Sequence, residues 1–174
     1  MRRAVLALVL LVAGCTSTAP PTPMPTPPPF RDCASIFEGK AELPELALPC
    51  FTGGQNVQVG RLSGPAVINF WAPWCLECGE ELPAFQRLAD RGQVKVIGVA
   101  TDTNRSAAIS LATDLGVTMP TLLDVYGEFR RQLGTINLPL TVFVDSNGKV
   151  TTYVGSALKD ETLNKLVRER LGVG

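Results

Sequence analysis

The chain contains no histidine, and this absence removes several kinds of active site. Without imidazole there is no histidine general base, no cysteine–histidine nucleophile pair and no histidine ligand for zinc or copper. The formal net charge is zero, and the basic residues are scattered instead of forming a run. Such a charge distribution predicts no basic surface for binding phosphate groups, so nucleic acid is not an expected partner. The chemistry of this chain must therefore use thiols, carboxylates and backbone dipoles.

The apolar run at the N-terminus, Ala4–Ala13, is about half as long as a membrane span requires. Because it follows Arg2 and Arg3, it predicts the apolar region of a secretory signal and not a transmembrane helix. The run ends in "LVAGC", which resembles the lipobox of bacterial lipoproteins. We therefore expect residues 1–14 to be a cleaved signal peptide and Cys15 to carry a lipid. An ordinary signal followed by a coincidental cysteine is the alternative.

Proline-rich, uncharged sequence follows Cys15. Residues 16–30 ("TSTAPPTPMPTPPPF") hold seven of the chain's 14 prolines and no charged side chain. Such a composition does not form a core and favours an extended, semi-rigid conformation. We expect residues 15–32 to be a linker that holds a single domain, residues 33–174, away from a membrane. Together these features predict an extracytoplasmic protein, lipid-anchored to the bacterial cell membrane, in a compartment that permits disulfides.

Strand and helix signals alternate along the rest of the chain. Residues 65–72 and 94–101 are β-branched, nearly continuous apolar runs, typical of strands buried on both faces of a parallel sheet. Between them, residues 77–91 carry apolar side chains at helical spacing. The predicted fold class is therefore α/β, with a central sheet and helices on both sides. Further helices are expected at residues 106–115, 126–133 and 159–171, and hairpins at residues 51–62 and 140–155.

Single residues mark the ends of two of these elements. Asp160 is the expected N-cap of the last helix, and Gly172 is the expected residue at its end. Asn147 and Gly148 suit a tight hairpin turn with positive φ.

Two cysteines, Cys75 and Cys78, lie where the first core strand gives way to a helix. Cys75 falls at or just before the first helical turn, where unpaired amides and the helix dipole stabilise a thiolate. A zinc site would need two more ligands, and only Cys33 and Cys50 remain once Cys15 is acylated. We expect Cys33 and Cys50 to form a structural disulfide, with free buried thiols or a second redox pair as alternatives.

The segment "NFWAPWCLECGEELP" resembles the active-site segment of the thioredoxin superfamily. It is most similar to the membrane-tethered TlpA/ResA/CcmG-like thiol-disulfide oxidoreductases, and the similarity covers about residues 44–171. The resemblance implies a thioredoxin-like fold, in which a central mixed β-sheet is flanked by helices. It also implies a central βα insertion before Pro139, and the hairpin expected at residues 51–62 would form an N-terminal extension of this fold.

The same resemblance assigns a substrate-binding role to residues around Cys75. Pro139, in "NLPLTVFVDSNGKV", is expected to follow a cis bond that places the Leu138 backbone beside Cys75, where it pairs with a substrate strand. Trp74 is expected to flank the thiol as part of the docking surface. An ordinary turn proline and a packing tryptophan are the alternatives.

A carboxylate is expected to serve as acid and base. Asn69 stands where thioredoxins have a buried aspartate, so the resemblance passes this role to Glu81, three residues after Cys78. In a site without histidine, Glu81 is the best-placed group to move a proton to or from Cys78. A solvated helix residue is the alternative reading of Glu81.

The implied activity is thiol-disulfide exchange, in which Cys75 attacks a partner disulfide and Cys78 resolves the mixed disulfide. Glu77, between them, should disfavour thiolate, so we expect a reductant of protein disulfides, with cytochrome c maturation as one task. The expected partners are protein disulfide or dithiol substrates and a membrane thiol-transfer protein that recycles the pair. No cofactor or metal is expected. An oxidase of secreted-protein thiols, a peroxiredoxin-like peroxidase and a non-catalytic adaptor are the alternatives.

Overall fold

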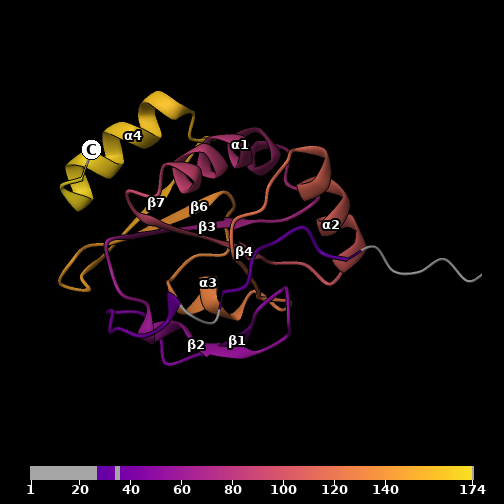
Figure 1. Cartoon of the computed structure of the whole chain (residues 1–174), viewed down its shortest axis with the longest axis horizontal. Coiled ribbons are helices and arrows are strands. Elements are labelled where there is room, and N and C mark those ends of the chain that lie inside the picture. The colour runs from indigo at the N-terminus through magenta and orange to yellow at the C-terminus, as the bar shows by residue number, and fades with distance from the viewer. Residues whose placement is uncertain (1–26, 34–35, 174) are drawn as a thin grey trace, which may run out of the picture.

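The computed structural model of the chain describes residues 27–33 and 36–173. Its main sheet has five strands in the order β5-β4-β3-β6-β7, with β3 parallel to β4 and antiparallel to β6 (Figure 1). The strands are β3 (Ala66–Trp71), β4 (Lys95–Ala100), β5 (Thr121–Leu123), β6 (Leu140–Val144) and β7 (Val150–Val154). The helices are α1 (Leu76–Arg91), α2 (Arg105–Asp114), α3 (Glu128–Gln132) and α4 (Asp160–Leu171). Each predicted helix is present, with its ends within two residues of the prediction.

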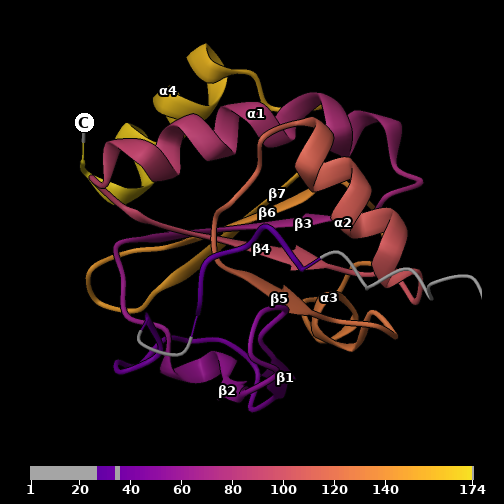
Figure 2. The ribbon, with the colours of Figure 1, turned by 45° about the vertical axis from the view of Figure 1, so that its right-hand side comes forward.

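The sheet separates two apolar cores, which explains why the sequence of β3 is continuously apolar. All six residues of β3 are buried, and alternate side chains point to opposite faces. Val67 and Trp71 pack with α1 and α4, whereas Ile68 and Phe70 pack with α3 and the N-terminal hairpin. Figure 2 shows α1 and α4 on one side of the sheet and the hairpin and α3 on the other. The predicted mixed sheet flanked by helices is confirmed.

The predicted insertion and N-terminal extension are both present. The unit α2-β5 lies between β4 and α3, and β5 pairs in parallel with β4 at the edge of the sheet. The extension is a hairpin of β1 (Ala47–Pro49) and β2 (Asn56–Gln58), followed by a short 3-10 helix, η2 (Val59–Arg61). Its first strand precedes the predicted range of residues 51–62, because the two glycines of that range, Gly53 and Gly54, form the turn with positive φ.

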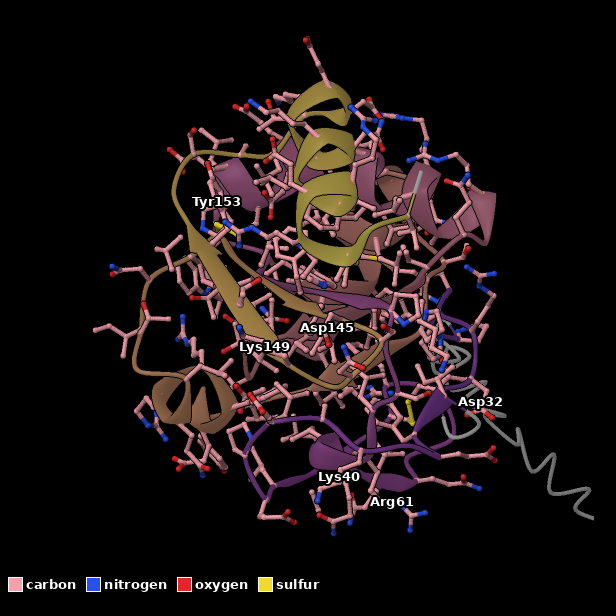
Figure 3. All side chains as sticks on the ribbon, turned by 90° about the vertical axis from the view of Figure 1, so that its left-hand side faces the viewer. Asp32, Lys40, Arg61, Asp145, Lys149 and Tyr153 are labelled. Atoms are coloured by element: carbon pink, nitrogen blue, oxygen red, sulfur yellow. A yellow bond between two sulfur atoms is a disulfide. The ribbon has the colours of Figure 1, made fainter. Side chains whose placement is uncertain are left out.

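The hairpin of β6 and β7 turns over four residues that begin at Asp145. The N–H of Gly148 donates to the carbonyl of Asp145, and of the predicted pair only Gly148 has positive φ, at 83°. A Cβ at Gly148 would lie 2.6 Å from the Lys40 carbonyl oxygen, so this position needs glycine for space as well as for conformation. Figure 3 labels Asp145 and Lys149 at the turn, and also Lys40, which lies in the segment that Gly148 approaches.

The last helix begins differently from the prediction. Its N-cap is Lys159, which makes no side-chain cap hydrogen bond, and Asp160 is the first helical residue. The Asp160 carboxylate is instead paired with the guanidinium of Arg87 on α1, with 2.6 Å between the closest atoms. An ion pair between two helices thus replaces the predicted cap. Gly172 ends the helix in the left-handed region, as predicted.

The packed region begins before residue 33, the predicted start of the domain. Phe30 is 3% exposed, and its ring centroid lies 4.6 Å from that of Phe51 and 6.2 Å from that of Trp71. Its carbonyl accepts a hydrogen bond from the hydroxyl of Thr52. The expectation that residues up to Phe30 stay out of a core is therefore wrong for Phe30. The predicted signal peptide and Cys15 lie outside the described residues.

Cys33 and Cys50 form a disulfide. The backbone of Cys50 also forms an isolated antiparallel β-bridge with Leu122 of β5. The disulfide therefore ties the N-terminal segment to the edge of the main sheet. In the chain-entropy view a crosslink of this span is worth about 3 kcal/mol. Among the described residues, no helix is both long and apolar enough to span a membrane.

Candidate active site

Cys75 and Cys78 lie at the junction of β3 and α1, where the sequence predicted them. The backbone N–H of Cys75 donates to the Ala72 carbonyl just after β3, and Cys75 then serves as the N-cap of α1. Its Sγ accepts a 3.2 Å hydrogen bond from the backbone N–H of Cys78. The two sulfurs are bonded, so the structure is that of the oxidised protein. After reduction the same amide and the helix dipole stabilise a thiolate on Cys75.

The two sulfurs differ in their access to a partner. Cys78 is fully buried, whereas Cys75 retains 9% exposure. A partner disulfide must reach the attacking sulfur directly. This difference favours Cys75 as the nucleophile and Cys78 as the resolving thiol.

Glu81 is fully buried and lies one helical turn after Cys78, on the same face of α1. One carboxylate oxygen accepts a 2.5 Å hydrogen bond from Nδ2 of Asn69, and the other accepts a 2.9 Å hydrogen bond from the backbone N–H of Leu158. Burial raises the pKa of Glu81 to about 7, against the effect of these two hydrogen bonds, and the nearby Glu77 raises it further. Near neutral pH, Glu81 can therefore both accept and donate a proton.

The structure shows that Asn69 contacts Glu81. The sequence alone showed only that Asn69 replaces the buried aspartate of thioredoxins. It lies on β3 beneath Glu81, and it faces Thr141 across the β3-β6 pair. Both Oδ1 of Asn69 and the hydroxyl of Thr141 are buried without a hydrogen-bond partner among the described residues. Sequence reasoning missed Thr141 and Leu158, since neither lies near the cysteines in the chain.

The Leu138–Pro139 peptide bond is cis, as the resemblance implied. Leu140, which follows it, pairs with Phe70 near the end of β3. This register places Pro139 at the end of the sheet where Cys75 caps α1. A second cis bond, Gly64–Pro65, precedes β3 and was not predicted.

The two tryptophans of the motif have different environments. Trp71 is fully buried between the sheet and α1, so it is a core residue. Trp74 is 64% exposed and directly precedes Cys75. Trp74 is therefore exposed next to Cys75 in the chain, and its role in docking a partner stays a prediction.

The four cysteines among the described residues form two disulfides and not a zinc site. Cys33 is bonded to Cys50, and Cys75 is bonded to Cys78. Within residues 27–33 and 36–173, no three cysteine, aspartate or glutamate side chains are grouped so that they could hold a metal ion. The arrangement supports exchange of a dithiol and a disulfide, with a carboxylate placed to move the proton.

Comparison with known proteins places this site in a family context. The sequence profile described as the AhpC/TSA family matches residues 40–153. The chain is 32% identical over 117 residues to the thiol:disulfide interchange protein DsbE of Pseudomonas fluorescens biotype C, and the match covers 64% of each protein. It is 26% identical over 140 residues to the thiol-disulfide oxidoreductase ResA of Bacillus subtilis (strain 168), covering 78% of this chain and 76% of ResA.

A solved structure shows the same fold. A thioredoxin-like protein from Porphyromonas gingivalis superposes with a TM-score of 0.63 at 30% sequence identity. The superposition covers 77% of this chain and 94% of that protein.

Proposed function

The chain belongs to the AhpC/TSA family, and we propose that it is a thiol-disulfide oxidoreductase of the DsbE and ResA type that reduces disulfides in partner proteins. The observation that carries the proposal is the placement of Cys75 at the N-terminus of α1 with a buried carboxylate, Glu81, one turn behind Cys78. This arrangement supplies a nucleophile, a resolving thiol and a proton acceptor in one place.

The reaction proceeds in two displacements. The thiolate of reduced Cys75 attacks one sulfur of the partner disulfide, and the other partner sulfur leaves as a thiolate. Glu81 then takes the proton of the Cys78 thiol, and the Cys78 thiolate attacks Sγ of Cys75. The mixed disulfide breaks and the second partner thiolate leaves. Two electrons have passed to the partner, and Cys75 and Cys78 form the bond seen in the structure.

The direction of the reaction depends on how well the reduced pair is stabilised. Glu77 is exposed in the first turn of α1, between the two cysteines. A carboxylate there opposes the thiolate that the helix dipole favours, which makes the disulfide form more favourable and the dithiol a better reductant. A membrane thiol-transfer protein would supply the electrons, and apocytochrome c is the candidate substrate. Oxidation of secreted thiols is the same exchange in reverse.

A stoichiometric assay tests this function. Reduced protein, freed of reductant, should reduce one disulfide of a denatured model protein per chain, and mass mapping should then find Cys75 bonded to Cys78. The Cys33–Cys50 disulfide should remain intact throughout. The same protein should consume no hydrogen peroxide beyond a control without enzyme. Peroxide turnover with a thiol donor, and no disulfide reduction, would replace the proposal with a peroxidase.

The proposed location is the outer face of the bacterial cell membrane, because a lipobox-like segment precedes Cys15 and a proline-rich linker follows it. Cys15→Ser should release the protein from the membrane, since acyl chains on this residue would provide the anchor. Fractionation and immunoblotting measure the distribution, and the thermal midpoint of the released protein should match that of the parent. Equal membrane partitioning of variant and parent would refute the lipid anchor.

A further inference from the structure

The first residues that the structure describes, 27–31, lie against the domain and are here called the strap. Within the strap, Phe30 is buried against the rings of Phe51 and Trp71. Residue 31 is an arginine whose backbone N–H and Nε both donate to the carbonyl of Thr118, at 2.9 Å and 3.3 Å. A buried ring and a pair of hydrogen bonds hold the strap in place, so it belongs to the domain and not to a free linker.

The surface under Phe30 is itself held from two sides. The guanidinium of Arg105 lies 4.0 Å from the ring centroid of Phe51, and its Nη2 donates a hydrogen bond to the carbonyl of the same residue. The adjacent Cys50 is bonded to Cys33. A cation over an aromatic ring and a disulfide both restrict movement. Phe51 therefore stays in place, and release of the strap would expose the Phe30 ring to water.

The strap lies at the end of the sheet that carries the reactive cysteine. Trp71 is the last residue of β3, and Cys75 follows it by four positions. Pro27 and Pro28 line a hollow together with residues 103–106, which follow the end of β4 and begin α2. Because β3 and β4 are parallel, both strands end at the same side of the domain. Figures 1 and 2 both show the strap, in indigo, beside α2.

The length of chain before the strap limits how far this end of the domain can lie from a membrane. Eleven residues separate Cys15, the proposed lipid site, from Pro27. Eleven extended residues span at most about 40 Å. This length is similar to the width of a folded domain of this size. The end of the domain that carries Cys75 therefore stays near the bilayer, whereas the opposite end is free to point away from it.

We propose that the strap fastens the lipid tether to the active-site end of the domain, so that Cys75 faces the bilayer and exchanges with a dithiol that an integral membrane protein presents at the bilayer surface. This inference rests on the proposed function and the proposed anchor, and it adds the orientation of the site and the place of the exchange. Phe30 takes no part in the chemistry and acts only by fixing the point where the tether joins the domain.

The exchange at the bilayer surface recharges the oxidised pair. A thiolate of the membrane protein attacks Sγ of Cys75, and Cys78 leaves as a thiolate that takes up a proton. The second thiolate of the membrane protein then attacks the first, and Cys75 leaves as a thiolate. The membrane protein is oxidised to a disulfide, and Cys75 and Cys78 have together received two electrons.

The test measures how far two labelled positions lie from the bilayer, with the lipidated full-length protein in phosphatidylcholine vesicles. One form carries a fluorescent donor on Cys75 in a Cys78→Ser background. The other carries it at position 149, through Lys149→Cys in a background of Cys75→Ser and Cys78→Ser. Lys149 is exposed in the turn after β6, which pairs with the start of β3 and so lies at the opposite end of the sheet. Energy transfer to an acceptor on the lipid head groups reports the distance.

The donor on Cys75 should lie nearer the bilayer than the donor at position 149, by up to about 20 Å, since the six residues of β3 rise ~3.3 Å each. Equal transfer from the two positions, or greater transfer from position 149, would overturn the inference. A parent that does not associate with the vesicles would overturn the lipid anchor and this inference together.

Phe30→Ser tests the strap itself, with Phe30→Leu as the matched control that keeps an apolar side chain at the same place. Release of the strap moves the junction of tether and domain to Cys33, which its disulfide still holds, and lengthens the tether from eleven to seventeen residues. The distance between the two labelled positions and the bilayer should then differ much less in the serine variant. The leucine variant should resemble the parent.

A rate measurement separates the strap from the active site. Reduced parent, Phe30→Ser and Phe30→Leu, all in vesicles, are given a peptide disulfide attached to a lipid head group and, separately, the same peptide in solution. Phe30→Ser should reduce the attached peptide about twofold more slowly, because effective concentration falls with tether length, and the soluble peptide at the parental rate. Equal slowing on both peptides would assign the effect to the thiols and overturn the role of the strap. Failure of the parent on both peptides would instead overturn the proposed function.

Discussion

Cys78→Ser should convert the protein from a catalyst into a trap that stays covalently attached to its partners. The variant keeps the Cys75 thiolate and its position at the start of α1, so the first displacement still occurs. It has no thiol to attack Sγ of Cys75, so the mixed disulfide accumulates and turnover stops. Non-reducing electrophoresis and mass spectrometry of the variant with a disulfide-containing protein measure the complex.

Cys75→Ser is the matched control for this trap. It removes the partly exposed sulfur and leaves Cys78, which is fully buried and cannot reach a partner disulfide. This variant should form no mixed disulfide and should have no reductase activity. If Cys75→Ser formed the complexes and Cys78→Ser did not, the assignment of nucleophile and resolving thiol would be reversed.

Glu81→Gln should slow resolution of the mixed disulfide by about a hundredfold, the lower end of the range for general acid-base catalysis. The carboxylate of Glu81 has its pKa raised to about 7 by burial, and it accepts the Cys78 proton only when it is ionised. The parental rate should therefore rise with pH through about 7 and level off above it. The rate of the variant should not show this rise with pH. Stopped-flow measurement of the rate at which the mixed disulfide is resolved, over about two pH units on either side of this pKa, shows both the slower rate and the changed pH dependence.

The same substitution should change how stability depends on pH. The pKa of Glu81 is about 7 in the folded state against its ordinary value of 4.5, so the folded state holds this proton more tightly. The stability that this proton contributes is complete below pH 4.5 and is lost as the pH rises through about 7. Between those limits the parent should lose about 3 kcal/mol relative to Glu81→Gln. Urea unfolding of both proteins at pH 4 and pH 8, just outside this window, measures the difference.

The glutamine variant should remain folded, so a slower reaction would report on the proton and not on a damaged core. Glutamine matches glutamate in shape, and its oxygen can still accept the hydrogen bond from Leu158. Its amide needs an acceptor, and Oδ1 of Asn69 has no partner among the described residues. Rotation of the Asn69 amide supplies that acceptor. A parent and a variant with the same pH profile would contradict the role given to Glu81.

The central part of the fold could be predicted because its signals are local. The apolar run that ends at Trp71 and the helical spacing after Cys78 fix a strand-to-helix junction, and the structure has α1 starting one residue before its predicted start at Glu77. The position of Cys75 at the N-cap follows directly from that junction. Burial of Trp71 follows from its place in a strand that is covered on both faces.

Other features depend on contacts between distant parts of the chain. Phe30 lies in proline-rich sequence, and only its packing on Phe51 and Trp71 shows that the core includes it. Asp160 was expected to cap α4, but its carboxylate pairs with Arg87. Sequence alone does not reveal that Arg87 lies beside it. β1 has only three residues and contains a proline, so it carries no recognisable strand pattern.

The site shows the same division between local and distant information. Helical spacing predicts that Glu81 shares a face with Cys78, but its burial comes from the whole fold. The hydrogen bond from Leu158 crosses 77 positions of sequence. The raised pKa of Glu81, which suits it to its role, could therefore be obtained only from the structure.

The reduction potential of the Cys75–Cys78 couple tests the central claim most directly. Equilibration with glutathione or dithiothreitol buffers at pH 7, followed by alkylation and mass spectrometry, measures the potential in the presence of the Cys33–Cys50 disulfide. We expect a potential closer to the ~−270 mV of thioredoxin than to the ~−120 mV of a strong periplasmic oxidant. Glu77→Gln should raise it by a few tens of millivolts at most, since ~30 mV corresponds to ~1.4 kcal/mol. A parental potential near ~−120 mV would contradict the assignment as a reductant and make the protein an oxidase of secreted thiols.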